Sequence, residues 1–243
     1  MAGRLEGRCA VVTGAAGNLG TAVCSRLLRE GAKVLALVHR DSELAPLGAA
    51  LLTGGTLDPK ALEVRRAELS EETSVEAAYD AAEQRFGPLF AAAHCAGTWA
   101  GARIEDTTVE VFERMLAVNL RSAFLCSRAA VRRMARHGEG RIVNVAAYTA
   151  AMGVGNAKNS AYAASKAGVI ALTRAVAEEN AARGIRASCI APGVMRTPMN
   201  ASAMPGADQA GWVPLEDAAN AILFLLSPEA GATTGAVVTL PSK

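Results

Sequence analysis

Hydrophobic residues along the chain form short apolar runs that alternate with longer segments of helical periodicity. Short runs rich in β-branched residues are typical of strands, and runs that are apolar on both faces are typical of parallel strands covered by helices. These runs predict strands at Cys9–Thr13, Lys33–Val38, Leu62–Ala67, Leu89–His94, Arg141–Ala146, Arg186–Ala191 and Ala236–Leu240. The helical segments between them are Asn18–Glu30, Ser74–Phe86, Val109–His137, Ala161–Arg183 and Leu215–Leu226.

This alternation predicts an α/β fold with right-handed crossovers. We expect a single doubly wound, Rossmann-type domain over residues 1–243, with a mainly parallel seven-stranded sheet and helices on both faces. The segment Ser42–Ala61 is longer than a usual connection and is predicted to be a small surface elaboration.

A basic cluster lies at the end of one predicted helix and consists of Arg132, Arg133, Arg136 and His137. Such a cluster could bind an anion. Favourable interaction with the helix dipole is the simpler interpretation.

Composition narrows the possible classes of function. Of 243 residues, 51% are hydrophobic, which is enough for a sizeable core, and the net charge of +2 with 4% aromatic residues argues against a nucleic-acid partner. Five scattered cysteines without a C-x-x-C pair, no signal-like start and only short apolar runs predict a cytoplasmic protein without membrane segments. His39, His94 and His137 lack metal-ligand spacing, so no metal is predicted.

The first predicted strand runs into the glycine-rich turn "TGAAGNLG", Thr13 to Gly20, and then into a helix. Glycines at such a turn let backbone N–H groups approach a pyrophosphate at the helix N-terminus. The turn therefore predicts a dinucleotide cofactor.

Four further motifs follow the turn in order: "HCAG" from His94, "AVNL" around Asn119, "YAASK" from Tyr162 and "APGVMRTP" from Ala191. With the glycine turn, they resemble the short-chain dehydrogenase/reductase family over almost the whole chain. Asn18 departs from the family's usual T-G-x-x-x-G-x-G, whereas Gly17 matches the spacing of its extended branch. Asparagine tolerates left-handed backbone angles, so the turn is expected to survive. "HCAG" replaces both asparagines of the family's N-N-A-G.

The resemblance implies a set of cofactor-binding positions. They are Gly14, Gly17, Asn18, Leu19, Gly20, His39, Arg40, Glu68, Leu69, Ala96, Gly97, Lys166, Pro192, Gly193, Val194 and Thr197. After the second strand, Val38 offers no carboxylate to a ribose 2′-hydroxyl, and Arg40 could meet a 2′-phosphate. NADP is therefore predicted in preference to NAD, with NAD left possible.

Tyr162 and Lys166 are four residues apart on a predicted helix, so both side chains point into one cleft. A phenol has a pKa of about 10, and a nearby ammonium, together with the cationic oxidised nicotinamide, is expected to favour its phenolate. By resemblance, Tyr162, Lys166 and Asn119 are the catalytic residues, and Asn119 anchors a water in the proton relay.

The family's substrate-polarising serine is missing. Strand alignment places Ala147 at its position, whereas counting back from Tyr162 places Thr149 there. One such donor is worth about 2.7–4 kcal/mol of transition-state stabilisation, which a strongly electrophilic substrate need not use.

The segment Thr197–Asp217 forms a short substrate lid over about 198–214 and resembles that of dihydropteridine reductases, which also lack the serine. Trp99 either stacks on a flat heterocycle or, with Trp212, packs the lid against the body. Candidate substrate residues are thus Trp99, Ala147, Thr149 and Tyr162.

We expect an NAD(P)H-dependent oxidoreductase that transfers hydride to a small activated C=O or C=N substrate, including pterin-like or quinonoid compounds. Two alternatives remain open: a 3-oxoacyl or general carbonyl reductase that uses Thr149, and a non-catalytic nucleotide-binding subunit of a hetero-oligomer. Apolar positions on Val109–His137 and Ala161–Arg183 predict a homotetramer or homodimer, because the family pairs these helices across a two-fold axis.

Overall fold

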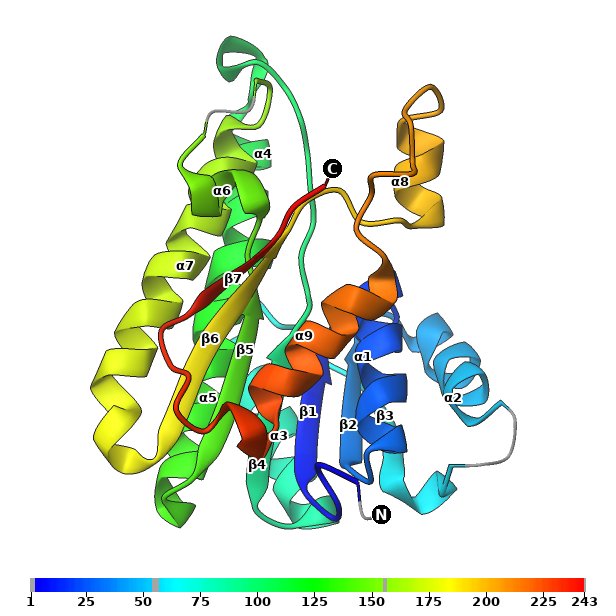
Figure 1. Ribbon diagram of the computed structural model, residues 1–243, viewed down its shortest axis with the longest axis vertical. Coiled ribbons are helices and arrows are strands. Elements are labelled where there is room, and N and C mark those ends of the chain that lie inside the picture. The colour runs from blue at the N-terminus through cyan, green and yellow to red at the C-terminus, as the bar shows by residue number, and fades with distance from the viewer. Residues whose placement is uncertain (1–2, 54–56, 155–156, 243) are drawn as a thin grey trace.

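Parallel strands form one seven-stranded sheet through the middle of the molecule (Figure 1). The computed structural model describes residues 3–53, 57–154 and 157–242. The strands are β1 (Cys9–Thr13), β2 (Lys33–Val38), β3 (Leu62–Arg66), β4 (Leu89–His94), β5 (Gly140–Val145), β6 (Ile185–Pro192) and β7 (Val237–Leu240). Their order is β3-β2-β1-β4-β5-β6-β7 with every pair parallel, which confirms the predicted doubly wound fold. The order reverses between β1 and β4, where such sheets bind ligands at their carboxyl edge.

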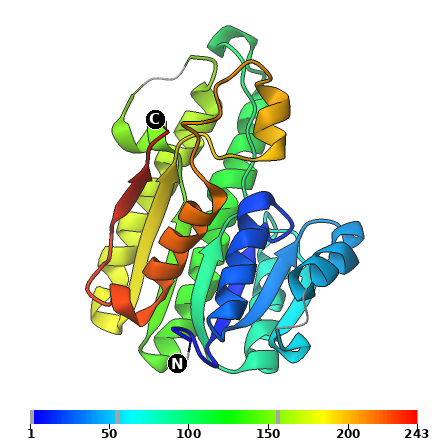
Figure 2. The same cartoon turned by 45° about the vertical axis from the view of Figure 1, so that its right-hand side comes forward.

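Helices cover both faces of the sheet (Figures 1 and 2). One face packs against α1 (Asn18–Arg29), α2 (Leu44–Leu52) and α9 (Leu215–Leu226), and the other against α3 (Glu72–Phe86), α5 (Ser122–His137) and α7 (Ser160–Asn180). Shorter helices are α4 (Val109–Met115), α6 (Tyr148–Met152) and α8 (Pro198–Ala203). Single turns are η1 (Asp41–Glu43), η2 (Pro59–Ala61), η3 (Ile104–Asp106), η5 (Ala181–Arg183) and η6 (Pro228–Ala230).

Two predictions about the helices need correction. The run Val109–His137 is not one regular helix, because a π-helical segment, η4 (Leu116–Arg121), separates α4 from α5. Ser42–Ala61 is more than a surface elaboration, because it contains α2, whose Leu47 and Leu51 are buried in the core.

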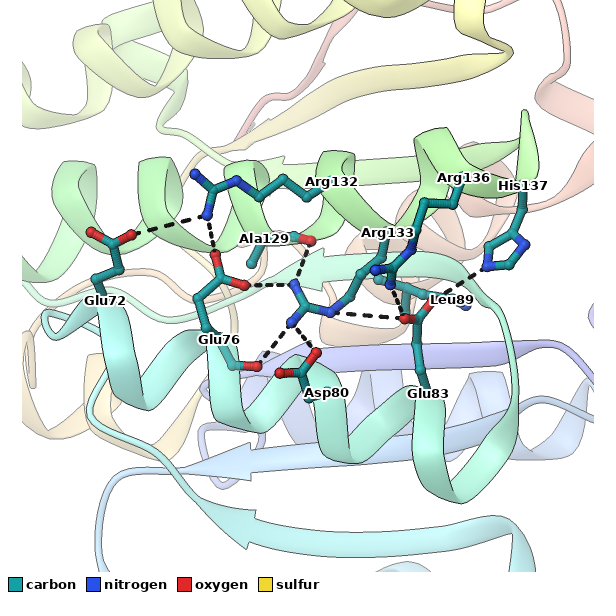
Figure 3. Close-up of polar contacts among 10 residues, drawn as sticks. All are labelled: Glu72, Glu76, Asp80, Glu83, Leu89, Ala129, Arg132, Arg133, Arg136 and His137. Carbon is teal, nitrogen blue, oxygen red and sulfur yellow. Dashed lines mark hydrogen bonds and ion pairs between the residues drawn. The ribbon is translucent and has the colours of Figure 1, made fainter.

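Ion pairs between α3 and α5 account for the basic cluster (Figure 3). The guanidinium group of Arg133 is buried and lies 2.8 Å from a carboxylate oxygen of Glu76, while Arg136 and His137 pair with Glu83. Placement against the helix dipole is therefore an incomplete explanation, since the two amphipathic helices dock through these charges. The sequence of α5 alone does not show its partners.

Within the described residues, we find no helix that combines the length and the apolarity needed to cross a bilayer.

Candidate active site

The glycine turn after β1 is shaped by close backbone contacts. Gly14 has a φ of +62°, and a Cβ atom there would lie 2.7 Å from the backbone nitrogen of Ala96, so a side chain is excluded. A Cβ atom on Gly20 would lie 2.2 Å from the carbonyl oxygen of Gly14, so α1 packs directly under the turn. Asn18 is the first residue of α1 and has no positive φ. The expectation that Asn18 would need left-handed tolerance is wrong, since Gly14 takes that conformation.

A cavity of about 650 Å³ opens between this turn, the end of β2 and the loop after β4. Its volume lies in the range of ordinary ligand pockets. Several residues predicted to bind cofactor line it: Gly14, Gly17, His39, Arg40, Glu68, Leu69, Ala96 and Gly97. Gly14, Gly17 and Gly97 line it without side chains, which leaves room for a pyrophosphate close to the protein backbone. The residues present therefore fit the nicotinamide dinucleotide that the fold implies.

The remaining predicted cofactor residues do not line this cavity. Leu19 is buried in the core, and Asn18 and Gly20 belong to α1 beneath the turn. Lys166 lies on α7, Pro192 is the last residue of β6, and Gly193, Val194 and Thr197 follow that strand.

The loop after β6 is held by the last residue of β7, Leu240, and by Ser242, which follows that strand. The Gly193 N–H donates to the carbonyl oxygen of Leu240 at 2.8 Å, and the Val194 N–H donates to Oγ of Ser242 at 2.8 Å. A Cβ atom on Gly193 would lie 2.2 Å from Oγ of Ser242. Thr197 is buried and caps α8, because its hydroxyl accepts the N–H of Asn200 in the first turn of that helix. The contact between these two segments leaves no signal in the sequence, because they lie about 48 residues apart along the chain.

Tyr162 and Lys166 both lie on α7 at the carboxyl edge of the sheet. The Lys166 side chain is 4% exposed, and Nζ donates to the carbonyl oxygen of Val145 at 2.8 Å. Nζ also lies 6.0 Å from the centroid of the Tyr162 ring, which confirms that the two residues share a face.

The ionisation of the pair differs from the sequence prediction. Burial lowers the pKa of Lys166 to about 8, which leaves it mainly cationic at neutral pH. Burial also raises the pKa of Tyr162 to about 12. In the protein chain alone, desolvation thus outweighs attraction to the ammonium, and Tyr162 is a neutral phenol rather than a phenolate. A neutral phenol is a proton donor.

Asn119 lies in the π-helical segment η4, a type of irregularity that is frequent at functional sites. Its buried amide forms a two-point clamp on Thr98: Oδ1 accepts the Thr98 N–H at 2.8 Å and Nδ2 donates to the Thr98 carbonyl oxygen at 3.0 Å. Nδ2 also donates to Oγ of Ser165 at 3.0 Å, and that hydroxyl donates to the carbonyl oxygen of Tyr162 at 2.7 Å. Asn119 therefore joins the loop after β4 to the helix that carries Tyr162 and Lys166.

Gly97 brings the cavity wall against these residues. A Cβ atom on Gly97 would lie 3.2 Å from Oδ1 of Asn119 and 3.2 Å from Nζ of Lys166. Because Gly97 has no side chain, the cavity wall lies directly against Asn119 and Lys166. Thr98 and Ser165, which complete this connection, were missed because their role depends on contacts distant in sequence.

The two candidates for the serine position lie close together after β5. Ala147 directly precedes α6 and is 5% exposed, whereas Thr149 is partly buried in the first turn of α6. Both therefore remain candidates.

The two tryptophans have different environments. Trp99 is 60% exposed, and its Nε1–H donates at 2.7 Å to Oδ1 of Asn159, the residue before α7. Trp212 is buried, as expected for a residue that packs the lid segment. Trp99 is fixed at its polar edge with much of its ring open to solvent, which suits stacking better than packing.

His94 replaces the first asparagine of the family motif and lies in a buried polar network. Its Nε2 is 2.8 Å from the Tyr79 hydroxyl, and its Nδ1 is 2.8 Å from Oδ1 of Asn144, whose Nδ2 donates to Oγ1 of Thr173 at 2.9 Å. Since Oδ1 can only accept, Nδ1 carries the proton and Nε2 accepts from Tyr79. Burial lowers the pKa of His94 to about 4, so the ring is neutral. The network ties α3, β4, β5 and α7 together, and the departure from the motif is structurally compensated.

Comparisons with known proteins agree with this arrangement. The family model for short chain dehydrogenase matches residues 8–208. The 2-(S)-hydroxypropyl-CoM dehydrogenase 3 of Xanthobacter autotrophicus is 32% identical, covering 97% of this chain and 96% of the relative. The 2,5-dichloro-2,5-cyclohexadiene-1,4-diol dehydrogenase LinX of Sphingobium indicum is 34% identical, covering 99% and 96%. The crystal structure of levodione reductase superposes with a TM-score of 0.89 at 29% identity, covering 98% of this chain and 97% of that one. The chain belongs to the short-chain dehydrogenase/reductase family and is an NAD(P)-dependent oxidoreductase.

Proposed function

We propose that this protein reduces a small, activated C=O or C=N group within a flat ring, with Tyr162 as the proton donor. The observation that carries this proposal is the arrangement of half-buried Tyr162 with buried Lys166 and Asn119 beside the cavity. The nicotinamide ring of the bound cofactor supplies the hydride. Tyr162 holds the transferable proton on its phenol oxygen, and burial keeps that proton in place at neutral pH. The Lys166 ammonium stabilises the phenolate left after proton transfer. Asn119 keeps the loop after β4 and helix α7 in fixed positions relative to each other.

A flat, electrophilic substrate is favoured by three features. Ala147 offers no hydroxyl at the strand-aligned serine position, Trp99 presents an open indole ring, and the segment over about 198–214 is short for a lid. Pterin-like and quinonoid compounds combine a flat ring with an activated acceptor. A relative whose name specifies a cyclohexadiene diol supports a six-membered ring in the site.

We propose that NADP is preferred to NAD. Val38 ends β2 with an apolar side chain, so no carboxylate at that position can accept from a ribose 2′-hydroxyl. Arg40 lines the cavity, and within residues 3–53, 57–154 and 157–242 no carboxylate pairs with its guanidinium group. A cytoplasmic location, where both reduced cofactors are available, stays a prediction.

The Arg40→Ala variant is expected to bind NADPH roughly tenfold more weakly, because a charge-assisted contact to the 2′-phosphate is lost. NADH affinity should not change. Fluorescence titration of both reduced cofactors with both proteins measures this. Equal affinities for NADH and NADPH in the wild type, unaltered by the substitution, would refute phosphate recognition by Arg40.

We propose a homotetramer or homodimer that pairs α4, α5 and α7 across a two-fold axis. Val109, Phe112 and Phe124 are 71%, 39% and 45% exposed, an unusual set of apolar side chains for one free surface. Light scattering should show an oligomer at micromolar concentration, and Phe112→Asp with Phe124→Asp should dissociate it. A monomeric wild type would contradict the proposal.

A further inference from the structure

Two consecutive backbone N–H groups converge on one carboxylate oxygen just after β2. Oε2 of Glu43 accepts the N–H of His39 at 3.2 Å and the N–H of Arg40 at 3.1 Å. Successive N–H groups that point to one place form a concave site for an anionic oxygen. In this structure the anionic oxygen comes from the chain itself.

This carboxylate belongs to the edge of the cofactor cavity. Glu43 lines the cavity together with His39 and Arg40, opposite the glycine turn. It is half-buried, on the last residue of the single turn η1. A negative group bound to the two N–H groups therefore occupies space that a ligand in the cavity can reach.

Of the basic side chains described beside Glu43, His39 and Arg66 lie near carboxylates, and the Arg40 guanidinium is left for a ligand. Nδ1 of His39 lies 3.6 Å from a carboxylate oxygen of Glu68, and Arg66 lies 3.8 Å from one of Asp41. Arg66 also donates to the carbonyl oxygen of His39 at 3.2 Å, which fixes the turn. Among the residues the structure describes, the Arg40 guanidinium has no such carboxylate partner.

We propose that the Glu43 carboxylate occupies the position at which the cofactor's 2′-phosphate binds, so that the two groups compete for it. A phosphate dianion takes the N–H groups of His39 and Arg40 and pairs with the Arg40 guanidinium only after Glu43 has swung away. NADH carries no group that must displace Glu43. Glu43 therefore determines how strongly NADPH is favoured, a role that rests on the phosphate recognition proposed above.

Glu43→Gln tests this by binding alone, with NADPH, NADH, 2′,5′-ADP and 5′-AMP titrated against each protein. The variant should bind NADPH and 2′,5′-ADP roughly three- to tenfold more tightly, with NADH and 5′-AMP unchanged, because the competing charge is gone. Glu43→Asp, which keeps the charge but shortens its reach, should show a smaller gain. Asp41→Asn is the matched control, since it removes the same charge from the same turn but leaves both N–H groups bound by Glu43.

Three results would overturn the proposal. Weaker NADH binding by Glu43→Gln would make Glu43 a ribose ligand instead. No change with any ligand would show that the carboxylate does not compete. An equal gain in NADPH affinity for Asp41→Asn would show that the effect comes from the overall charge of the turn and not from the two N–H groups. The Arg40→Ala result is read separately, so that phosphate recognition by Arg40 and competition by Glu43 can fail independently.

Discussion

The Tyr162→Phe variant is expected to bind reduced cofactor with unchanged affinity and to lose turnover by at least about a hundredfold, because it removes only the transferable proton. Tyr162 is half-buried, and the phenylalanine ring fills the same space. Steady-state rates on any accepted carbonyl or imine, together with cofactor titration, measure the two effects separately.

Tyr148→Phe is the matched control for this experiment. It removes a hydroxyl of the same chemistry from the neighbouring helix α6 and should retain most of the turnover. If Tyr162→Phe keeps wild-type turnover on a substrate that must gain a proton, Tyr162 is not the donor.

The second large effect is expected at the vacant serine position. Ala147→Ser should leave turnover of an activated ring substrate nearly unchanged and raise turnover of ordinary ketones. The increase is limited to the about 2.7–4 kcal/mol that one oxyanion donor is worth, which is a factor of about a hundred to a thousand. Rates of both variant and wild type on a quinonoid compound and on a simple cyclic ketone measure it.

Thr149→Val is the complementary variant and should leave turnover of the activated substrate nearly unchanged. If it instead lowers turnover a hundredfold while Ala147→Ser does little for ketones, Thr149 has taken the role of the serine. The enzyme would then be a conventional 3-oxoacyl or general carbonyl reductase, and the preference for activated substrates would be wrong.

Much of the fold is predictable from sequence because the parallel strands are apolar on both faces. Lys33–Val38 and Leu89–His94 match β2 and β4 residue for residue. The π-helical segment around Asn119 was not predictable, since its wider turn leaves no mark on the spacing of apolar residues. The partners of Arg133 were likewise hidden, because they lie on α3 and meet α5 only after packing.

At the candidate active site, sequence spacing predicted which side chains lie close together but not how deeply they are buried. The interval between Tyr162 and Lys166 correctly placed both on one face, yet it gave no measure of burial, which raises the pKa of the tyrosine in the protein chain alone. Glu43 was missed for a related reason. A carboxylate three residues after Arg40 can reach back to the N–H groups before it, but a capping motif usually starts with serine or threonine, so the signal was absent.

Oxidation of reduced cofactor against a substrate panel tests the central claim most directly. The panel contains quinonoid dihydropterins, quinones, cyclic ketones and 3-oxoacyl thioesters, each with NADPH and with NADH, and each repeated with Tyr162→Phe. We predict rapid oxidation of NADPH with at least one flat, activated ring compound and loss of that activity in Tyr162→Phe. Tight cofactor binding with no oxidation against any member would contradict the account and indicate a non-catalytic nucleotide-binding subunit.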